Sequence, residues 1–221
     1  MVVLEMKEIC YAYEEGRPIL SNVHIEFETG KMYAILGPSG SGKTTLLSLI
    51  GGLDIPQKGE ILFEGENISQ CGLACHRRNH VSLIFQSYNL IDYMTPIENV
   101  ALTARQDPLA LLLRLGLTAE EAKRNVMKLS GGQQQRVAIA RALASDTPVI
   151  LADEPTGNLD EDTAGEITDI LKESAHELNK CMIVVTHSNK LAAKADVVLY
   201  LKCGSIHTCL LYTSPSPRDR G

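Results

Sequence analysis

The stretch Gly37–Thr45, with the sequence GPSGSGKTT, constrains the fold of this chain more than any other part of it. It contains the pattern G-x-x-x-x-G-K-[ST] without a mismatch. The apolar run 32–36 before it predicts a buried strand, and the run 45–50 after it predicts the beginning of a helix. A glycine loop between a strand and a helix points backbone N–H groups at an anion, and the helix N-terminus adds partial positive charge. The sequence therefore predicts a phosphate-binding site in an α/β fold, and a chance glycine-rich turn is the weaker interpretation.

Two side chains of this loop are expected to have tasks of their own. Lys43 is placed to reach the β- and γ-phosphates of a nucleotide, and the Thr44 hydroxyl is placed to ligate Mg²⁺. The other residues of the loop are expected to surround the phosphates: Gly37, Pro38, Ser39, Gly40, Ser41, Gly42 and Thr45.

The apolar run 149–152 ends in two carboxylates, Asp153 and Glu154. A buried strand that ends in aspartate typically presents a partner for Mg²⁺ in nucleotide-binding α/β proteins, so we assign Asp153 to the metal. Glu154 lies one residue further on and therefore points elsewhere, where it could polarise a water molecule. The alternative is a solvent-exposed acidic strand end, which the phosphate loop in the same chain makes less favourable.

Two more polar residues follow apolar runs that predict strands. Gln86 follows the run 81–85, and His187 follows the run 181–185 after one threonine. Because ligands gather at the carboxyl ends of parallel strands, both residues are predicted to belong to the site. A lone histidine is more often structural, but this position favours a contact between His187 and the γ-phosphate.

Antiparallel strands are predicted to open the chain. Residues 2–9 alternate in polarity, and residues 22–27 are expected to pair with residues 32–36. Tyr13 lies between the opening strands, where an aromatic ring could stack on adenine. The alternative, a tyrosine on the surface of the sheet, fits Tyr11 better than Tyr13.

Residues 87–130 differ in character and predict a helical insertion in the α/β core. Thr95–Glu98 is a capping box with proline at the first helical position. Thr118–Glu121 is a second box, which predicts a helix running toward Leu129.

A third capping box, from Ser130 to Gln133, begins a strongly predicted helix. Gly131 and Gly132 lie inside this box, although glycine costs a helix about 1 kcal/mol relative to alanine. A helix cap alone explains the serine and the glutamine, but not the two glycines. We therefore interpret the segment as a second group of exposed backbone N–H donors for an anion.

Composition argues against several functional classes. The net charge is −6, from 21 Lys and Arg against 27 Asp and Glu, whereas a general nucleic-acid binder is usually basic. No apolar run approaches the ~18 residues of a membrane span, and the N-terminus lacks the pattern of a signal peptide. The chain is therefore expected to be cytosolic, and another chain would have to supply any membrane part.

The six cysteines are expected to be free thiols, as in other cytosolic chains of this size. Cys71, Cys75, His76 and His80 are spaced so that they could bind zinc. A turn of helix with incidental thiols is favoured, because the paired C-x-x-C spacing is absent.

The chain is predicted to form one domain over residues 1–207. The segment 208–221 has no core pattern, and its end, SPSPRDRG, is typical of a disordered or non-native tail.

These motifs, in this order, resemble the nucleotide-binding subunits of ABC transporters over residues 2–206. The resemblance rests on the phosphate loop, the signature LSGGQ at Leu129–Gln133, and the Walker B strand ending in Asp153 and Glu154. Further matches are the Q-loop glutamine Gln86, the D-loop 158–160, the switch histidine His187 and the adenine-stacking Tyr13. The implied fold is a P-loop NTPase core with a mostly parallel sheet, an N-terminal antiparallel β subdomain and an inserted α-helical subdomain at about 87–130.

The resemblance also implies a mechanism with ATP and Mg²⁺. Two copies would pair head to tail and sandwich two ATP molecules, each between the phosphate loop of one copy and the signature of the other. Glu154 would be the general base, His187 would hold the γ-phosphate, and Gln86 would link Mg²⁺ to transmembrane permease subunits at the cytoplasmic face of the membrane. The signature residues that would contact the ATP of the other copy are Ser130, Gly131, Gly132 and Gln133.

The run 155–160, PTGNLD, resembles the branch of this family that exports lipoproteins, macrolides or antimicrobial peptides. The helical arm over residues 98–116 is shorter than is usual in that branch, and the tail replaces the usual C-terminal helix.

Three other functions remain open at this point. The first alternative is a non-transport ATPase of the same family that regulates a membrane-bound cell-division or cell-wall complex. A DNA-repair or translation ATPase ranks lower, because those usually carry tandem cassettes or insertions. A small-molecule P-loop kinase ranks lowest, because it would not need LSGGQ.

Overall fold

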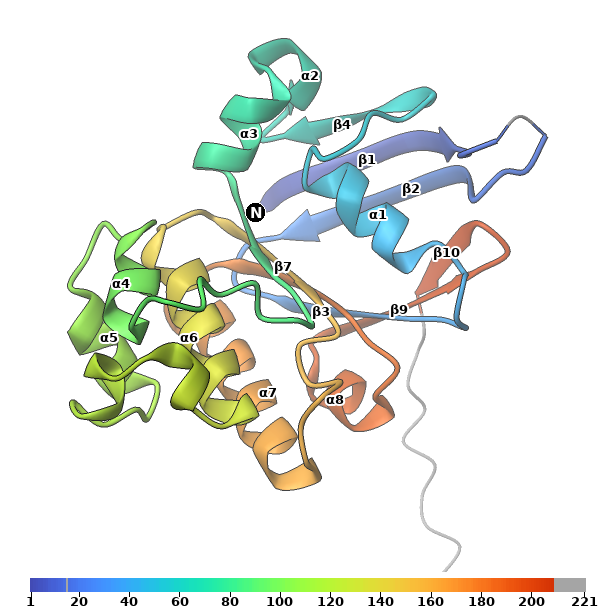
Figure 1. Cartoon of the computed structure of the whole chain (residues 1–221). Helices are drawn as coiled ribbons and strands as arrows, with labels where there is room; N and C mark the ends of the chain where they lie inside the picture. The colour runs from blue at the N-terminus through green and yellow to red at the C-terminus, as the bar shows by residue number, and fades with distance from the viewer. Residues whose placement is uncertain (15, 209–221) are drawn as a thin grey trace, which may run out of the picture.

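The computed structural model describes residues 1–14 and 16–208. A six-stranded sheet with the strand order β10-β9-β3-β8-β7-β6 forms its centre (Figure 1). All neighbouring strands run parallel except β10, which is antiparallel to β9. The carboxyl ends of the parallel strands therefore meet at one edge of the sheet. The strands are β3 (Met32–Leu36), β6 (Val81–Ile84), β7 (Val149–Asp153), β8 (Cys181–Val185), β9 (Val197–Lys202) and β10 (Ser205–Thr208).

A second sheet is antiparallel, with the strand order β2-β1-β4-β5. Its strands are β1 (Val2–Tyr11), β2 (Leu20–Glu28), β4 (Lys58–Phe63) and β5 (Glu66–Asn67). The expected pairing of residues 22–27 with residues 32–36 is wrong, because β2 pairs with β1 while β3 pairs with β8 and β9. The cause is the composition of β3, whose almost fully buried apolar side chains suit a central parallel strand covered on both faces.

Helix α1 (Lys43–Ile50) packs between the two sheets (Figure 1). Its buried Leu46, Leu49 and Ile50 share one core cluster with side chains of both sheets, such as Phe27 and Ile183. The helix begins at the predicted place and ends at Ile50, directly before Gly51 and Gly52.

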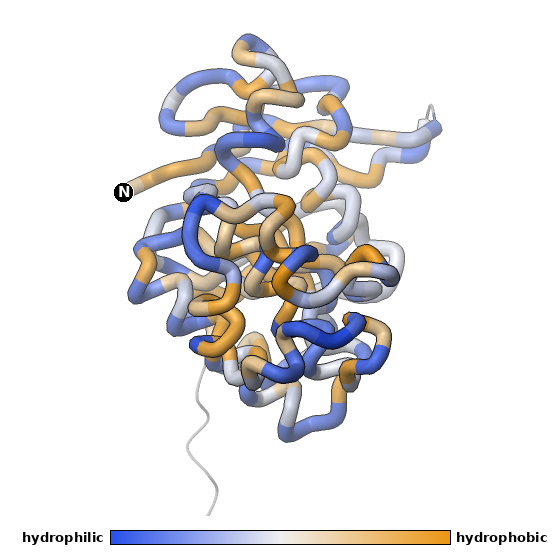
Figure 2. The backbone as a smooth tube through the Cα atoms, turned by 60° about the vertical axis from the view of Figure 1, so that its left-hand side comes forward, coloured by the Kyte–Doolittle hydropathy of each residue, from blue (hydrophilic) through white to orange (hydrophobic). Residues whose placement is uncertain are grey.

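Three helices cover the other face of the six-stranded sheet: α6 (Gly131–Ala144), α7 (Glu161–Glu177) and α8 (Asn189–Lys194). Successive residues of a strand thus enter different cores, as Ala34 and Ile35 of β3 do. Burial of both faces explains why these strands are continuous apolar runs in the sequence. Figure 2 shows the hydrophobic segments concentrated where the layers pack, with hydrophilic segments on the outer loops.

The helical arm, residues 87–130, contains α4 (Pro96–Ala101) and α5 (Pro108–Arg114). The capping box at Thr95 forms as predicted. The helix predicted to run from Thr118 toward Leu129 is wrong: two short 3₁₀ turns, η1 (Glu121–Lys123) and η2 (Val126–Lys128), take its place.

Contacts with the preceding loop explain why this helix does not form. The Thr118 box is present, since each backbone N–H of Thr118 and Glu121 donates to the side chain of the other. Further along, the Val126 N–H donates to the Met94 carbonyl at 3.0 Å, and the Asn125 amide donates to the Asp92 carbonyl at 2.9 Å. These tertiary hydrogen bonds replace the helical ones that the local sequence favours.

Of the four cysteine and histidine residues, Cys71 ends α2 (Ile68–Cys71), Cys75 and His76 lie in α3 (Leu73–Asn79), and His80 follows α3 directly. His76 is fully buried, and its Nε2 lies 2.9 Å from the Ile50 carbonyl oxygen. His80 stacks on Phe63 with ring centroids 3.9 Å apart. The two histidines therefore serve packing, as the helix-turn interpretation expects.

Thr208, which the sequence assigned to the tail, is the last residue of β10 and pairs with Leu199. Residues 209–221 lie outside the described residues, so the interpretation of that tail stays a prediction. Within the described residues, no helix is both long and apolar enough to cross a membrane.

Candidate functional site

A cleft of about 620 Å³ lies at the carboxyl-end edge of the parallel sheet. It brings together side chains from the ends of β6, β7 and β8 and from the loop between β3 and α1. The predicted residues that line it are Tyr13, Ser39, Gly40, Gly42, Lys43, Thr44, Thr45, Gln86, Asp153, Glu154 and His187. Ile19, Gly157 and Val185 line it as well and were not predicted. Gly157 could have been found, because it lies in the run that the resemblance already used.

The phosphate loop is held open around its lysine. Gly42 has a φ of 97°, and a Cβ at this position would lie 2.7 Å from Ile19, so only glycine fits. The Lys43 ammonium donates to the carbonyl oxygens of Gly37 at 2.9 Å and Pro38 at 3.1 Å. Its side chain is thereby aimed along the inside of the loop.

Ser41 and Lys43 indicate what the loop is built to hold. The Ser41 hydroxyl is buried without a hydrogen-bond partner. Burial lowers the pKa of Lys43, and the carboxylates of Glu154 and Asp153 act against this shift. A buried cation and an unsatisfied donor, among backbone N–H groups at a helix N-terminus, form a site for a polyanion.

The predicted metal ligands Thr44 and Asp153 lie together. The Thr44 hydroxyl donates to Asp153 Oδ2 at 3.2 Å. Burial raises the pKa of Asp153, while the Thr44 hydrogen bond and the Lys43 charge lower it. Because a bound cation would stabilise the partly desolvated carboxylate, these hard oxygen ligands fit Mg²⁺.

Glu154 adopts a strained backbone conformation, with a φ of 46°. Its N–H donates to the Val185 carbonyl at 2.9 Å, which fixes the residue against the end of β8. One carboxylate oxygen, Oε2, accepts the His187 N–H at 3.3 Å. The other oxygen, Oε1, is buried without a hydrogen-bond partner, although His187 Nε2 lies 3.5 Å away. A carboxylate oxygen without a hydrogen-bond partner is able to accept a proton from water.

His187 also reaches the phosphate loop, since its Nε2 lies 3.3 Å from the Lys43 ammonium. Its side chain thus lies between the lysine of the loop and the carboxylate of Glu154. The cleft therefore holds a cation, an imidazole and a carboxylate side by side.

Gln86 is joined to the loop that follows β7. Its Nε2 donates to Asn158 Oδ1 at 3.4 Å, and Asn158 Nδ2 donates back to the Gln86 carbonyl at 3.1 Å. A Cβ on Gly157 would lie 3.0 Å from Gln86 Nε2, so the glycine leaves room for this side chain. Gln86 therefore lies at the cleft edge that also carries Asp153.

Tyr13 lies at the rim of the cleft with 66% of its surface exposed. Its hydroxyl is 3.1 Å from Thr45 Oγ1, at the beginning of α1. Tyr11, which the sequence placed on the sheet surface, is instead buried at 7% exposure.

The signature segment Ser130–Gln133 is not part of the cleft lining. Its capping box forms as predicted, with Ser130 and Gln133 each accepting the backbone N–H of the other. Gly132 has a packing reason as well, because a Cβ there would lie 2.5 Å from Thr163 of α7. The signature segment thus forms the N-terminal end of α6, outside the cleft that the phosphate loop of the same chain lines.

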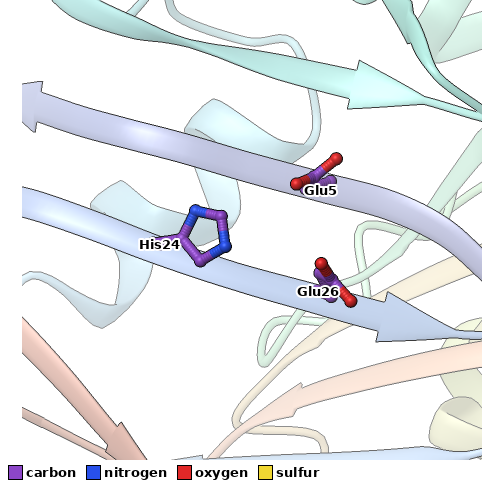
Figure 3. Close-up of side chains that lie close together, drawn as sticks. All are labelled: Glu5, His24 and Glu26. Atoms are coloured by element: carbon purple, nitrogen blue, oxygen red, sulfur yellow. The ribbon is translucent and has the colours of Figure 1, made fainter.

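A second group of possible metal ligands lies on the antiparallel sheet, outside the cleft lining. Glu5, His24 and Glu26 project from the neighbouring strands β1 and β2, with one ligand atom of each within 4.8 Å of the others (Figure 3). One Glu5 carboxylate oxygen is already paired with the Lys7 ammonium at 3.2 Å. None of these three side chains lines the cleft at the strand ends.

Comparison with known proteins shows which family this chain matches. Residues 20–157 match the family described as ABC transporter. An uncharacterized ABC transporter ATP-binding protein of Bacillus subtilis is 44% identical over 93% of this chain and 96% of its own length. The lipoprotein-releasing system ATP-binding protein LolD of Pseudomonas fluorescens is 39% identical, over 92% and 96%. The macrolide export ATP-binding/permease protein MacB of Hyphomonas neptunium is 40% identical over 92% of this chain but only 34% of its own.

A solved structure agrees with these relatives. It is the dimeric post-hydrolysis state of the ATP-binding cassette MJ0796, bound to ADP and Pi. It is 36% identical to this chain, covers 92% of this chain and 96% of its own, and has a TM-score of 0.81.

Proposed function

The chain belongs to the ABC transporter family, whose ATP-binding subunits hydrolyse ATP to energise transport, and from this premise we propose the partners and residues with which it works. We propose that it drives a membrane permease that exports a lipoprotein, peptide or macrolide. The names of two relatives support this choice, one releasing lipoproteins and one exporting macrolides. They also make a purely regulatory role at a cell-division complex the less favoured function.

Nucleotide binding is proposed to use the whole cleft. Tyr13 at the rim would stack on the adenine ring, and the phosphate loop would surround the phosphates with its N–H groups. The Lys43 ammonium would exchange its two carbonyl partners for the β- and γ-phosphates, which are stronger acceptors.

Mg²⁺ is proposed to be held by Thr44, Asp153 and Gln86. When bound, the ion would neutralise charge on the phosphates during phosphoryl transfer. The hydrogen bond between Thr44 and Asp153 already brings two of these oxygen ligands together. Gln86 adds an amide oxygen from the neighbouring strand end.

The chemical step is proposed to use Glu154 and His187. The free oxygen Oε1 of Glu154 would accept the proton of the attacking water. His187, held to Glu154 by its backbone N–H, would donate to the γ-phosphate and stabilise the charge that develops there.

A second copy is proposed to complete the site. In the described residues, the signature N–H groups at Ser130–Gln133 do not line the cleft of their own chain. The capping box uses the N–H groups of Ser130 and Gln133, so the N–H groups of Gly131 and Gly132 are the ones proposed to bind the phosphates held by another copy. The related dimeric cassette supports this arrangement.

The observation that carries the proposed ATP hydrolysis is the contact of His187 with both the Glu154 carboxylate and the Lys43 ammonium. The test is Glu154→Gln, which keeps the side chain's shape but removes the base. Because the phosphate and metal ligands remain, ATP should bind normally while hydrolysis slows by ~10²–10⁴-fold. Trapped ATP should then give a dimer of about twice the 24.1 kDa chain mass on a sizing column, and ADP should dissolve it.

The control is Ser130→Arg added to Glu154→Gln. A bulky cation at the start of α6 should prevent the dimer, whereas the monomer should still bind ATP. Native turnover by Glu154→Gln would disprove the catalytic assignment. A variant that traps ATP but stays monomeric would disprove the two-copy site alone.

Docking to the permease is proposed to use the loop between Gln86 and α4. Tyr93 in this loop is 80% exposed, and tyrosine is one of the residue types enriched at protein interfaces. Replacing Tyr93 and Met94 with aspartate should weaken co-purification with the membrane fraction and leave ATP affinity unchanged. If this double variant is recruited to the membrane fraction as well as the native chain, the docking surface lies elsewhere on the molecule. The proposed location at the cytoplasmic face of the membrane would then need another contact.

A further inference from the structure

Tyr11 is a buried tyrosine that lies behind the cleft rather than in it. It is the last residue of β1 and is 7% exposed, whereas Tyr13, two residues on, is 66% exposed. The two rings meet edge to face, with centroids 5.1 Å apart and planes at 90°. This is the favourable geometry for an aromatic pair, so the buried ring supports one side of the exposed ring.

The Tyr11 ring is itself fixed by Asp54. Its hydroxyl donates to Asp54 Oδ2, and the other carboxylate oxygen accepts the Ile55 N–H at 2.8 Å. The hydrogen bond to Asp54, burial and the Asp54 charge together raise the pKa of Tyr11 to about 12, which favours the protonated, donating hydroxyl. The carboxylate is thus satisfied on both oxygens and holds the tyrosine in one position.

The segment that carries Asp54 is joined firmly to the end of β1. Gln57 donates its backbone N–H to the Cys10 carbonyl at 3.0 Å and its side-chain amide to the Ala12 carbonyl at 2.8 Å. Together with the Tyr11–Asp54 bond, these contacts fix the backbone on both sides of Tyr11. The chain immediately before Tyr13 is therefore anchored to the loop that follows α1.

Tyr13 itself has two contacts that define its ring: the edge of Tyr11 and the hydrogen-bonding distance from its hydroxyl to Thr45. An exposed side chain otherwise loses rotamer freedom when a ligand orders it, and ordering in advance removes that cost. We infer that Tyr11, held by Asp54, is a positioning residue that keeps Tyr13 ready to stack on the adenine ring. This inference rests on the proposed adenine contact of Tyr13.

The test distinguishes binding of the adenine base from binding of the phosphates. ATP and inorganic tripolyphosphate are titrated calorimetrically into the full chain and its variants, since tripolyphosphate uses the phosphate loop alone. Tyr11→Leu should weaken ATP binding about three- to tenfold, the range for losing one pre-ordered side chain. Tripolyphosphate affinity should stay within twofold. Tyr11→Phe and Asp54→Ala, which cut only the tether, should weaken ATP in the same direction but less.

In steady-state kinetics, Tyr11→Leu should raise the KM for ATP and leave kcat unchanged. Tyr33→Phe is the matched control. Tyr33 is equally buried, packs against another ring and accepts the Glu28 N–H at 2.8 Å, but it has no contact with Tyr13. Tyr33→Phe should leave the ratio of the ATP affinity to the tripolyphosphate affinity unchanged.

A double variant gives the sharpest outcome. Tyr13→Ala alone should weaken ATP by roughly five- to 150-fold, the range for loss of one base stack. Adding Tyr11→Leu to it should cause no further loss, because Tyr11 acts only through Tyr13. An additive loss, or an equal loss for tripolyphosphate, would overturn the positioning role. If Tyr13→Ala leaves ATP affinity unchanged, the proposed adenine contact fails first and this inference fails with it.

Discussion

At the scale of single residues, the cleft brings Lys43, His187 and Glu154 next to one another, although they come from distant parts of the chain. The identities of Lys43, Asp153 and Glu154 follow from their patterns. The sequence predicted that Lys43 and His187 reach the same end of the site, because the ends of parallel strands meet at one edge. It did not predict their direct contact across 144 residues, which depends on the pairing of β3 with β8. The burial of Tyr11 was missed for the same reason, because its partner Asp54 lies 43 residues further on.

Lys43→Ala tests the binding half of the site. The ammonium meets the phosphates directly, and a charged hydrogen bond of this kind contributes about 1.5–3 kcal/mol. ATP affinity should therefore fall by at least ~10-fold, while the melting temperature stays close to that of the native chain. Calorimetry measures the first quantity and circular dichroism the second. Unchanged ATP affinity would remove the phosphate-loop assignment.

At the scale of elements, the helical arm shows where local sequence signals are sufficient and where they are not. The box at Thr95 gives a helix at the predicted place, and the box at Thr118 gives one turn of 3₁₀. The difference lies in distant partners, since residues 125 and 126 bond to the loop before α4. The antiparallel pairing of β2 was mispredicted in the same way, because local runs identify strands but not their neighbours.

Asn99 is the residue that fixes this arm. It is fully buried in α4, accepts the Ile91 N–H at 2.7 Å, and donates to the carbonyls of Ile91 and Thr95. Asn99→Ala leaves the half-buried Ile91 N–H without its acceptor and should cost about 1–3 kcal/mol in the free energy of unfolding. Hydrogen exchange should increase over residues 90–96, and ATP affinity should not change. The exposed Asn79→Ala serves as control, and equal effects from both variants would contradict this role.

At the scale of the whole molecule, one carboxylate joins the layers. Asp196, just before β9, accepts the Met32 N–H of β3 at 2.7 Å and pairs with His176 of α7 at 2.9 Å. Partial burial acts to raise the pKa of Asp196, but the Met32 and His176 contacts prevail and hold this pKa below its ordinary value. The folded state therefore favours the ionised form.

The direction of this shift fixes the pH dependence. The contribution of Asp196 is complete above its unfolded pKa of about 3.9 and is lost as the pH falls through the lower folded value. Asp196→Asn should thus lower the free energy of unfolding by about 1–2 kcal/mol at pH 7, and its difference from the native chain should narrow below about pH 4. Urea unfolding across this pH range measures both. A pH-independent difference would mean that the contact acts through packing alone.

The separation of the signature from its own cleft has a consequence for mixtures of damaged chains. A chain with Lys43→Ala keeps an unchanged signature segment, and a chain with Ser130→Arg keeps an unchanged phosphate loop. When the two are mixed, each mixed pair assembles one intact composite site from the undamaged halves. Two preparations that are each inactive should therefore recover about a quarter of the native turnover on mixing in equal amounts, as random pairing of copies requires.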